Sequence, residues 1–328
     1  MDILVLAKEI INGRRLKRGE DMSFFLECEL DPLCNGADMI RSVLCGDHVD
    51  LCSIINGKSG RCSENCRFCA QSANHCTGIE EYDFLDKERI LKECLHNENR
   101  GVHRFSIVTA GRTLNDKDYK NAVLAYKYLH GNSRMKLCAS HGLLTEEQLE
   151  GLRASGVTSY HCNIETSERN FPNICTTHTY CDKIECIKRA KKAGLKVCSG
   201  GIIGMGETAE DRLDMALSLS ELGVNSIPIN ALMPIKGTPF ETLERISEND
   251  ILRTVAIFRY LNPTAYIRLA AGRDLMKNAG ERAFHSGVNA TITGDMLTTS
   301  GNDIKSDIEM LDRLGFDTKR KDDDQDAV

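Results

Sequence analysis

The sequence lacks the charge and the long apolar runs that would indicate a nucleic-acid-binding protein or a membrane protein. Its 328 residues include 42 Lys and Arg against 48 Asp and Glu, so the formal net charge is −6. Non-specific capture of nucleic acid requires a basic surface, and the acidic balance argues against such a partner. No apolar run reaches the roughly 18 consecutive residues of a membrane span, and we expect no membrane contact.

The N-terminus lacks the pattern of a secretory signal. The chain begins MDILVLAKEIINGRRLKRGE, in which a short apolar patch precedes the basic residues. A secretory signal has the opposite order and ends at a cleavage site of small residues. We therefore predict a cytoplasmic protein.

Linkers and internal repeats are also lacking. Proline occurs six times, and no stretch rich in Gly, Pro or Ser divides the chain. We therefore predict one domain over residues 51–317, preceded by a helical extension over residues 1–50 with one helix at 7–16. Residues 318–328 are expected to be a disordered tail, because TKRKDDDQDAV is charged and has little apolar surface to bury.

Short apolar runs alternate with stretches of helical spacing from about residue 50 onward. The runs expected to be strands are 51–57, 103–110, 135–140, 157–165, 195–203, 224–232, 265–271 and 288–294. The stretches expected to be helices include 86–97, 145–156, 181–194, 209–223, 248–261 and 303–314. This alternation predicts parallel strands with crossover helices. We therefore expect an α/β fold, a closed (β/α)8 barrel of the TIM type, with an open doubly wound sheet as the alternative.

Cysteine is abundant, with 15 residues. An odd number of cysteines in a long chain without a secretory signal indicates thiols or metal ligands rather than disulfides. Most buried thiols act as small apolar side chains, and we expect no more of those not singled out below. These include Cys28, Cys34, Cys45, Cys52, Cys94, Cys181 and Cys186.

The strongest local signal is CSENCRFC, which places Cys62, Cys66 and Cys69 directly after the first predicted strand. A loop at the C-terminal end of a barrel strand lies on the face where active sites form. A zinc site would need a fourth ligand, which His75 or Cys76 would have to supply. Three thiolates suit a [4Fe–4S] cluster that keeps one iron open.

The spacing CxxxCxΦC, with Phe68 as its aromatic residue, is typical of radical S-adenosylmethionine enzymes. In these enzymes the open iron binds S-adenosylmethionine. A second motif, GxIxGxxE, ends the fifth predicted strand, and in the same enzymes it packs against the adenine. Its glycines allow the backbone to approach a flat ring closely. The residues of this motif are Gly200, Ile202, Gly204 and Glu207.

Asn163 and Glu165 end the fourth predicted strand and face the same side of it, because they are two residues apart. Such an amide and carboxylate pair could bind ribose hydroxyls, and a helix cap or a loop salt bridge is the plainer alternative. Cys162 has the opposite parity and is expected to face the helix layer.

Arg268 stands within the apolar strand AYIRLAA, where a buried charge must be paired. Cys138 and Cys198 lie on the apolar third and fifth strands. Two thiols and an arginine on inward-facing strands suggest a second inorganic site deep in the barrel.

Residues 50–316 resemble the biotin synthase family. The resemblance rests on GRCSENCRFCAQS, HCNIETS, NICTTHTY, KVCSGGIIGMGET, SIPINALMPIKGTP, YIRLAAGR and MLTTSGN. It implies a homodimeric (β/α)8 enzyme of biotin biosynthesis that inserts sulfur between two unactivated carbons of dethiobiotin. It also implies a [4Fe–4S] cluster, S-adenosylmethionine, an auxiliary iron–sulfur cluster as the sulfur source, and an electron donor such as flavodoxin or ferredoxin.

The resemblance assigns roles to single residues. The three cysteines of the CxxxCxΦC loop would hold the radical-generating cluster. Asn163 and Glu165 would contact S-adenosylmethionine, and Glu165 stands where the family commonly has Asp. Asn230, together with Asn163, would bind the ureido ring of dethiobiotin. Thr298 and Thr299 would lie near its carboxylate tail.

The auxiliary cluster departs from the family pattern at one position. Cys138, Cys198 and Arg268 match three of its ligands, whereas Ser106 stands at the fourth, which is a cysteine in the best-known members. A serine oxygen is a poorer ligand for iron than a thiolate. The cluster could therefore be a [2Fe–2S] or another type, with Ser106 as a ligand or only a neighbour. A non-protein sulfur or another thiolate would then replace it, and the nearest thiols by sequence are Cys162 and Cys175, of which strand parity disfavours Cys162.

Two alternatives remain from the sequence. Methylornithine synthase and the maturase of the [FeFe]-hydrogenase share the barrel and the cluster loop, but they do not need Cys138, Cys198 and Arg268 as one inward set. A non-catalytic iron–sulfur carrier needs no adenine-binding strand end. Formation of 5′-deoxyadenosine would exclude a carrier, and stimulation by dethiobiotin would exclude the other enzymes.

Overall fold

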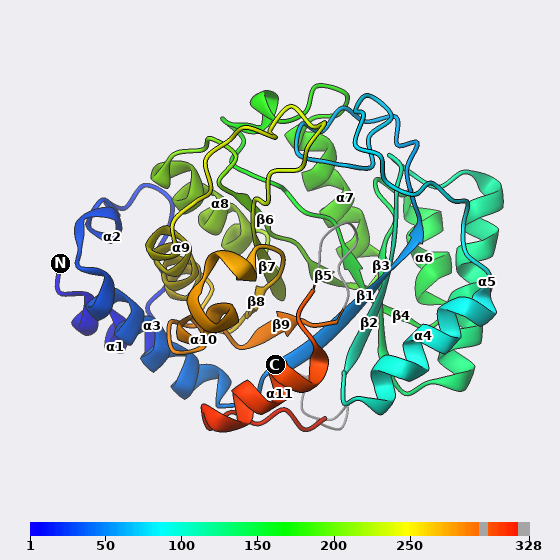
Figure 1. Ribbon diagram of the computed structural model, residues 1–328. Coiled ribbons are helices and arrows are strands. Elements are labelled where there is room, and N and C mark those ends of the chain that lie inside the picture. The colour runs from blue at the N-terminus through cyan, green and yellow to red at the C-terminus, as the bar shows by residue number, and fades with distance from the viewer. Residues whose placement is uncertain (295–300, 321–328) are drawn as a thin grey trace.

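The computed structural model describes residues 1–294 and 301–320, and strands alternate with helices along most of this length (Figure 1). The strands are β1 (Asp50–Lys58), β2 (Arg104–Thr109), β3 (Lys136–Ser140), β4 (Val157–His161), β5 (Lys196–Cys198), β6 (Gly201–Ile203), β7 (Ser226–Ala231), β8 (Tyr266–Leu269) and β9 (Ala290–Ile292). The helices after residue 58 are α4 (Lys87–Asn99), α5 (Asp116–Asn132), α6 (Glu146–Arg153), α7 (Tyr180–Lys192), α8 (Ala209–Glu221), α9 (Glu248–Leu261), α10 (Glu281–Phe284) and α11 (Ile304–Arg313).

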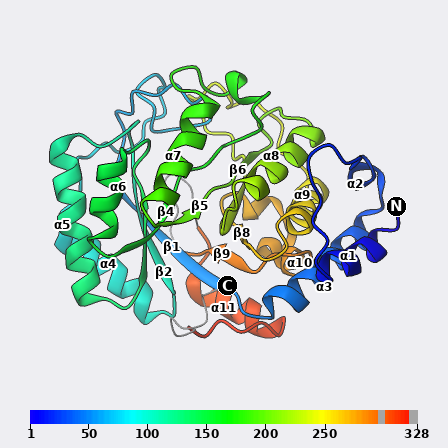
Figure 2. The same cartoon turned by 180° about the vertical axis from the view of Figure 1, so that it is seen from behind.

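The strands close into a parallel barrel, which confirms the predicted (β/α)8 fold. The hydrogen-bonded order is β5-β4-β3-β2-β1-β9-β8-β7-β6, and β5 also pairs with β7. β5 and β6 therefore act as two halves of one strand position, interrupted at Ser199 and Gly200, so the nine strands form eight positions around the barrel. Figures 1 and 2 show the helices around the outside of this ring.

The helices that follow the strands begin at capping residues. Thr145, Thr179 and Thr208 each form a capping box at the start of α6, α7 and α8. In this arrangement the side chain of the cap and that of the third helical residue satisfy backbone N–H groups of the first turn. Asp86 and Ser247 cap α4 and α9 with a side-chain oxygen. Local sequence thus sets where most of the crossover helices begin.

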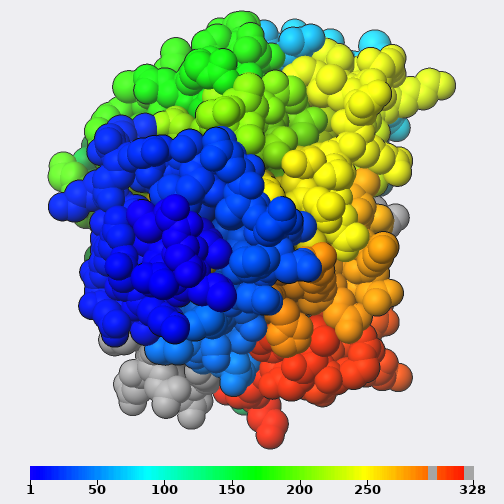
Figure 3. All heavy atoms as spheres, turned by 90° about the vertical axis from the view of Figure 1, so that its left-hand side faces the viewer, coloured from blue at the N-terminus to red at the C-terminus, as the bar shows by residue number. Residues whose placement is uncertain are grey.

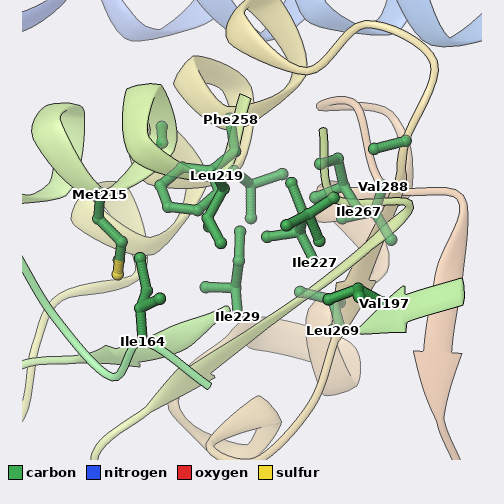
Figure 4. Close-up of a cluster of buried hydrophobic side chains, with 14 of the residues drawn as sticks. Ile164, Val197, Met215, Leu219, Ile227, Ile229, Phe258, Ile267, Leu269 and Val288 are labelled. Atoms are coloured by element: carbon green, nitrogen blue, oxygen red, sulfur yellow. The ribbon is translucent and has the colours of Figure 1, made fainter. Parts of the chain in front are cut away.

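The apolar core lies between the barrel and the helices. Figure 4 shows side chains of β7 and β8, such as Ile227 and Ile267, packed toward Phe258 of α9 and Leu219 of α8. Residues of the other parity on the strands face the barrel interior and include charged and polar side chains. This alternation leaves the interior free for chemistry.

The N-terminal extension differs from the prediction. The expected helix at 7–16 is wrong in its bounds, because α1 (Ile3–Ile11) begins after the N-cap Asp2 and ends near Gly13, whose φ is +105°. Two further helices, α2 (Phe24–Glu27) and α3 (Leu30–Cys45), were not predicted. α3 packs against α9, and α1 packs against α3. The Tyr260 hydroxyl of α9 also donates to the Ile3 carbonyl of α1 over 3.0 Å. Figure 3 shows the extension, in blue, covering one side of the molecule.

Among the described residues, no helix is both long and apolar enough to cross a membrane. The predicted tail at 318–328 lies mostly outside the described residues, which end at residue 320.

Candidate active site

Loops that follow β1, β4 and β7 gather at one end of the barrel, at the top of Figure 1. The β1 loop carries the three cysteines of the CxxxCxΦC motif. The Arg67 N–H donates to the Ile174 carbonyl over 2.9 Å, and the Arg67 guanidinium lies 4.9 Å from the centre of the Phe240 ring. The cysteine loop is therefore held by the loops that follow two other strands.

The cysteine loop folds back on itself. The Cys69 N–H donates to the Cys66 carbonyl over 2.9 Å, and the Ala73 N–H donates to the Cys62 carbonyl over 2.8 Å. Burial raises the pKa of the Cys69 thiol to about 11, and the charges of Cys62 and Glu165 add to this effect. Iron binding must therefore displace protons from these thiols.

The residues that could complete a zinc site are used otherwise. His75 Nδ1 lies 2.9 Å from the Cys69 carbonyl oxygen, and the Cys76 thiol is exposed. The donor set on this loop is thus three partly exposed thiols, which fits a cluster with an open iron better than a four-ligand zinc site.

Cys175 and His178 lie beside Cys66. Within the described part of the chain, the ligand atoms of these three residues are within 4.8 Å of one another. His178 Nδ1 is also 2.5 Å from a Glu64 carboxylate oxygen. The suggestion that Cys175 serves the auxiliary cluster is therefore wrong, because the β4 loop carries it to the rim of the barrel. Cys175 and His178 stand three residues apart in the sequence CTTH, and this spacing was the available signal that they could act together.

Asn163 and Glu165 lie together, as their spacing predicts. Asn163 Nδ2 donates to Glu165 Oε2 over 3.3 Å, and Asn163 Oδ1 accepts from the Gly200 N–H over 3.0 Å. Glu165 has a φ of +68°, and its Oε1 lies 3.7 Å from Lys183 Nζ. The pair therefore joins β4 to the interrupted strand, and its role toward ribose stays a prediction.

The GxIxGxxE motif forms a turn that its own glutamate holds. The Glu207 carboxylate accepts from the N–H groups of Gly204 and Met205, each over 2.7 Å, and from Arg212 Nε over 2.8 Å. Gly204 has a φ of +89°, which favours glycine. Glu207 thus shapes the strand end through the backbone.

Phe68 and Ile202 both pack on a small apolar cluster separate from the main core. This cluster comprises Ile174, Met205, Leu232 and Phe240. The cysteine loop and the motif strand therefore share one apolar surface at the rim, which suits a flat ring.

Asn230 bridges neighbouring strands at the same end of the barrel. Its Nδ2 donates to the Gly201 carbonyl over 3.1 Å, and its Oδ1 accepts from the Ala271 N–H over 3.2 Å. The amide keeps one further N–H and one further lone pair for a ligand. Thr298 and Thr299 lie outside the described residues.

A charged cluster fills the lower barrel interior. Arg268 donates through Nη1 to the Asp50 and Thr291 carbonyls and through Nη2 to the Asp50 carboxylate. Arg104 Nη2 lies 3.4 Å from the same carboxylate. Burial alone would raise the pKa of Asp50, but the charges of Arg104 and Arg268 hold it well below its usual range. The anionic neighbour that Arg268 was expected to need is therefore Asp50, which the sequence analysis missed.

Two of the predicted thiol ligands face this charged cluster. The Cys198 sulfur lies 3.4 Å from His161 Nδ1 and 3.5 Å from Ser226 Oγ. The Ser106 hydroxyl bonds to the Cys138 thiol, and burial raises the pKa of Cys138. The structure thus brings Cys138, Cys198, Ser106 and Arg268 into one interior.

Cys162 and Cys52 differ in which side they face. The Cys162 thiol contacts Cys186 of α7 in the helix layer, as strand parity predicts. Cys52 instead lies close enough to Cys138, Cys198 and Arg268 inside the barrel to interact with them electrostatically, whereas the expectation from the sequence was only an apolar filler. The parity of VDLCSI, which puts Cys52 on the same face as Asp50, was the available signal.

Comparison with known proteins places this site in a family. Residues 58–219 match the radical SAM superfamily, and residues 228–317 match the Biotin and Thiamin Synthesis associated domain. The biotin synthase of Alkaliphilus metalliredigens is 66% identical over 316 residues, which cover 96% of this chain and 99% of that protein. The chain belongs to the biotin synthase family. Another member, from Clostridium beijerinckii, is 65% identical over 95% of this chain and 98% of its own length.

Solved structures of other enzymes share the fold of this biotin synthase family member. Methylornithine synthase superposes with a TM-score of 0.82 at 20% identity, covering 96% of this chain and 97% of its own. The [FeFe]-hydrogenase maturase superposes with a TM-score of 0.79 at 18% identity, covering 96% and 75%. At such low identity these likenesses show the barrel and nothing of the reaction.

The family membership confirms several predictions from the sequence. The chain is a radical S-adenosylmethionine enzyme of biotin biosynthesis, with the [4Fe–4S] cluster, the S-adenosylmethionine and the auxiliary iron–sulfur cluster of that family.

Proposed function

We propose that the chain converts dethiobiotin to biotin and that the two thiol sites of its barrel divide the work. The observation that carries the proposal is that one barrel holds three cysteines on its rim loop and further buried thiols, beside two arginines, in its interior. A substrate held between these sites would have the radical source on one side and the sulfur source on the other.

Cys62, Cys66 and Cys69 would hold the [4Fe–4S] cluster. When bound, this cluster and S-adenosylmethionine supply a 5′-deoxyadenosyl radical. The protein positions and shields the cofactor. Phe68 and Ile202 offer the apolar surface for the adenine, and the rest of the GxIxGxxE motif, Gly200, Gly204 and Glu207, shapes the strand end beside it.

Asn163 and Glu165 would orient the cofactor from the end of β4. Their mutual hydrogen bond and the nearby Lys183 ammonium keep both side chains in place. Asn163 also bonds to Gly200, so a single hydrogen-bond network links the cofactor side chains to the motif strand.

Asn230 would bind the ureido ring of dethiobiotin, because a neutral amide has both a donor and an acceptor for such a ring. Its bonds to Gly201 and Ala271 fix the amide plane before substrate arrives. Thr298 and Thr299 are proposed for the carboxylate tail on the resemblance alone. A closed barrel excludes water and aligns one C–H bond at a time with the radical.

Cys138, Cys198 and Arg268, with Ser106 beside them, would hold the auxiliary cluster. Sulfur insertion removes two hydrogen atoms from dethiobiotin and forms two C–S bonds. Each hydrogen leaves as 5′-deoxyadenosine, so two molecules of S-adenosylmethionine are consumed for each biotin.

The remaining expectations stay part of this proposal. They are a cytoplasmic homodimer that receives electrons from a flavodoxin or a ferredoxin. They also include the division of the chain into a helical extension at 1–50, a barrel at 51–317 and a tail at 318–328.

The test is an anaerobic assay of the reduced, reconstituted enzyme with S-adenosylmethionine, with and without dethiobiotin. We expect 5′-deoxyadenosine that rises with dethiobiotin, and biotin at about half its amount. No deoxyadenosine would indicate a carrier. Deoxyadenosine that does not respond to dethiobiotin, with no biotin formed, would indicate another radical enzyme.

A further inference from the structure

We propose that Cys52 of β1 is the third thiolate ligand of the auxiliary cluster, in place of the family cysteine that Ser106 has replaced. The inference rests on the proposed function, because it assumes that the barrel interior holds this cluster. It goes further by naming a ligand on a different strand.

The parity of β1 points Cys52 into the barrel. Leu51 is fully buried in the apolar core between barrel and helices, so its neighbours along the strand face the other way. Asp50, two residues before Cys52, pairs with Arg268 of β8 and with Arg104 of β2 inside the barrel. Cys52 therefore shares the interior with these charges.

The strand register decides which interior residues share a level. In a (β/α)8 barrel, alternate strands contribute the four side chains of one layer, and the shear of about eight residues shifts each second strand by about two residues. The parallel register runs Cys52–Arg104–Lys136 across β1–β2–β3, Cys138–Ser159–Lys196 across β3–β4–β5, Cys198–Ser226–Tyr266 across β5–β7–β8, and Arg268–Ala290–Asp50 across β8–β9–β1.

Each of these four paths starts at one interior residue and ends two residues before the next one. The four interior residues, in order around the barrel, are Cys52, Cys138, Cys198 and Arg268. The path from Cys52 ends before Cys138, the path from Cys138 before Cys198, and the path from Cys198 before Arg268. The path from Arg268 returns to Asp50, two residues before Cys52. The set therefore forms one closed layer, with three thiols and one guanidinium from alternate strand positions.

Ser106 lies in a neighbouring layer. It stands on β2, between the strands that carry Cys52 and Cys138, and it pairs in register with Cys138. Its hydroxyl bonds to the Cys138 thiol. Ser106 is therefore placed to donate a hydrogen bond to a ligand sulfur.

The surroundings of Cys52 suit a metal ligand. Its hydrogen bond in the structure is a contact of 3.6 Å to the Ser53 carbonyl oxygen, which is weak. The guanidinium groups of Arg104 and Arg268 offset the negative charge that three thiolates and sulfide bring into a buried site. A thiolate also binds iron better than a serine oxygen does.

The test uses the variant Cys62→Ala/Cys66→Ala/Cys69→Ala, reconstituted with iron and sulfide under argon, so that only the interior site can hold metal. Bound iron and acid-labile sulfide are measured, together with the Mössbauer spectrum. Adding Cys52→Ser removes a ligand and is therefore expected to lower bound iron. The loss in iron affinity should exceed the about ten-fold that removing an outer-shell partner causes. Adding Ser106→Ala, which removes only a hydrogen bond to a ligand sulfur, is expected to lower bound iron clearly less than Cys52→Ser does. Cys94→Ser, a buried thiol on α4, is the matched control.

A second variant, in which the thiol and the hydroxyl exchange positions, distinguishes the loss of a ligand from the loss of the fold. Cys52→Ser combined with Ser106→Cys in the same background returns a thiolate to the family position and should restore the iron. Circular dichroism of each variant separates loss of a ligand from loss of fold, and restored iron in the swap would show that Cys52→Ser alone lost a ligand. Unchanged iron in Cys52→Ser, or equal loss in Ser106→Ala, would overturn the inference. No iron in the background variant would instead overturn the auxiliary site of the proposed function.

Discussion

At the scale of single residues, neighbours decide what each thiol does. Cys66 lies on the rim beside Cys175 and His178. Cys162 contacts Cys186 between barrel and helices, where the hydrogen bond with Cys186 and burial together raise the pKa of Cys162. The same side chain thus serves as a candidate ligand in one place and as a packing group in another.

Replacing Cys66 with Ala is expected to abolish cleavage of S-adenosylmethionine and to leave the fold intact. The rim loop holds three thiols for one cluster, and the loop lies outside the apolar core. The measurement is 5′-deoxyadenosine formed by the reduced enzyme under argon, with thermal unfolding as the check on the fold. Cys181→Ala, an exposed thiol on α7, is the control and should behave as the parent. Parental deoxyadenosine yield in Cys66→Ala would contradict the cluster assignment.

Replacing Asn230 with Ala is expected to weaken dethiobiotin binding by about ten- to hundred-fold. A buried partner left without its hydrogen bond costs about 1–3 kcal/mol. The measurement is the dethiobiotin concentration that half-saturates deoxyadenosine formation.

The structure sharpens the control for Asn230, because its amide also bridges Gly201 and Ala271. Asn262→Ala removes a buried amide that bonds to the Ala216 carbonyl, away from the site. Both variants should lose stability, and only Asn230→Ala should shift the half-saturation point. Equal half-saturation in the two variants would assign Asn230 a structural role only.

At the scale of elements, the break between β5 and β6 positions the site. Ser199 and Gly200 interrupt one strand position, and the carbonyl of Gly200 accepts from the N–H groups of Ile164 and Glu165. A Cβ at Gly200 would lie 1.9 Å from the Pro228 carbonyl oxygen, so only glycine fits between these strands. The break therefore aligns β4, β6 and β7 at the rim.

Gly200→Ala is expected to lower the melting temperature by several degrees and to weaken S-adenosylmethionine binding. The added methyl group must push β7 away, and a loss of about 1 kcal/mol shifts the melting temperature by about 2–4 °C in a domain of this size. Gly131→Ala is the matched control, because a Cβ there meets nothing within 4 Å and the position is helical. That variant should keep or slightly raise the melting temperature. Similar melting temperatures for the two variants would contradict the packing argument.

At the scale of the whole molecule, buried polar networks tie the barrel to its helices. His141, fully buried after β3, lies 2.9 Å from Thr109 Oγ1 through Nδ1 and 3.0 Å from the Tyr126 hydroxyl of α5 through Nε2. Burial lowers the pKa of His141 to about 3. The neutral imidazole is thus part of the folded state.

His141 should make the protein less stable as the pH falls below about 6.5, the pKa of an unfolded histidine. Between that pH and the folded pKa of about 3, the unfolded chain binds a proton that the folded chain does not. The free energy of unfolding then falls by up to about 1.4 kcal/mol for each pH unit that the pH is lowered. Urea unfolding of the holoenzyme at pH 7.5 and pH 5.5 measures the loss. His141→Gln should show a smaller loss between the two pH values, and an equal loss would contradict this account.

The sequence by itself determined the family and the alternation of strands and helices, and it singled out the rim thiols and two of the interior thiols that we propose as ligands. The cysteine loop and the GxIxGxxE motif are local patterns, so their residues could be read without knowing any long-range contact. Strand parity also placed Asn163 and Glu165 together and Cys162 in the helix layer. The N-terminal helices were read less well, because their positions depend on packing against α9.

Only the tertiary structure decided which distant residues meet inside the barrel. Cys52 and Cys138 are separated by β2 and two helices in the sequence, and closure with the shear of the barrel brings them to one level. Asp50 of β1 meets Arg268 of β8 because β9 pairs with both strands and so closes the barrel between them. Cys175 meets Cys66 because the loop after β4 returns to the rim. Register and closure are properties of the whole sheet, and no local segment of the sequence carries them.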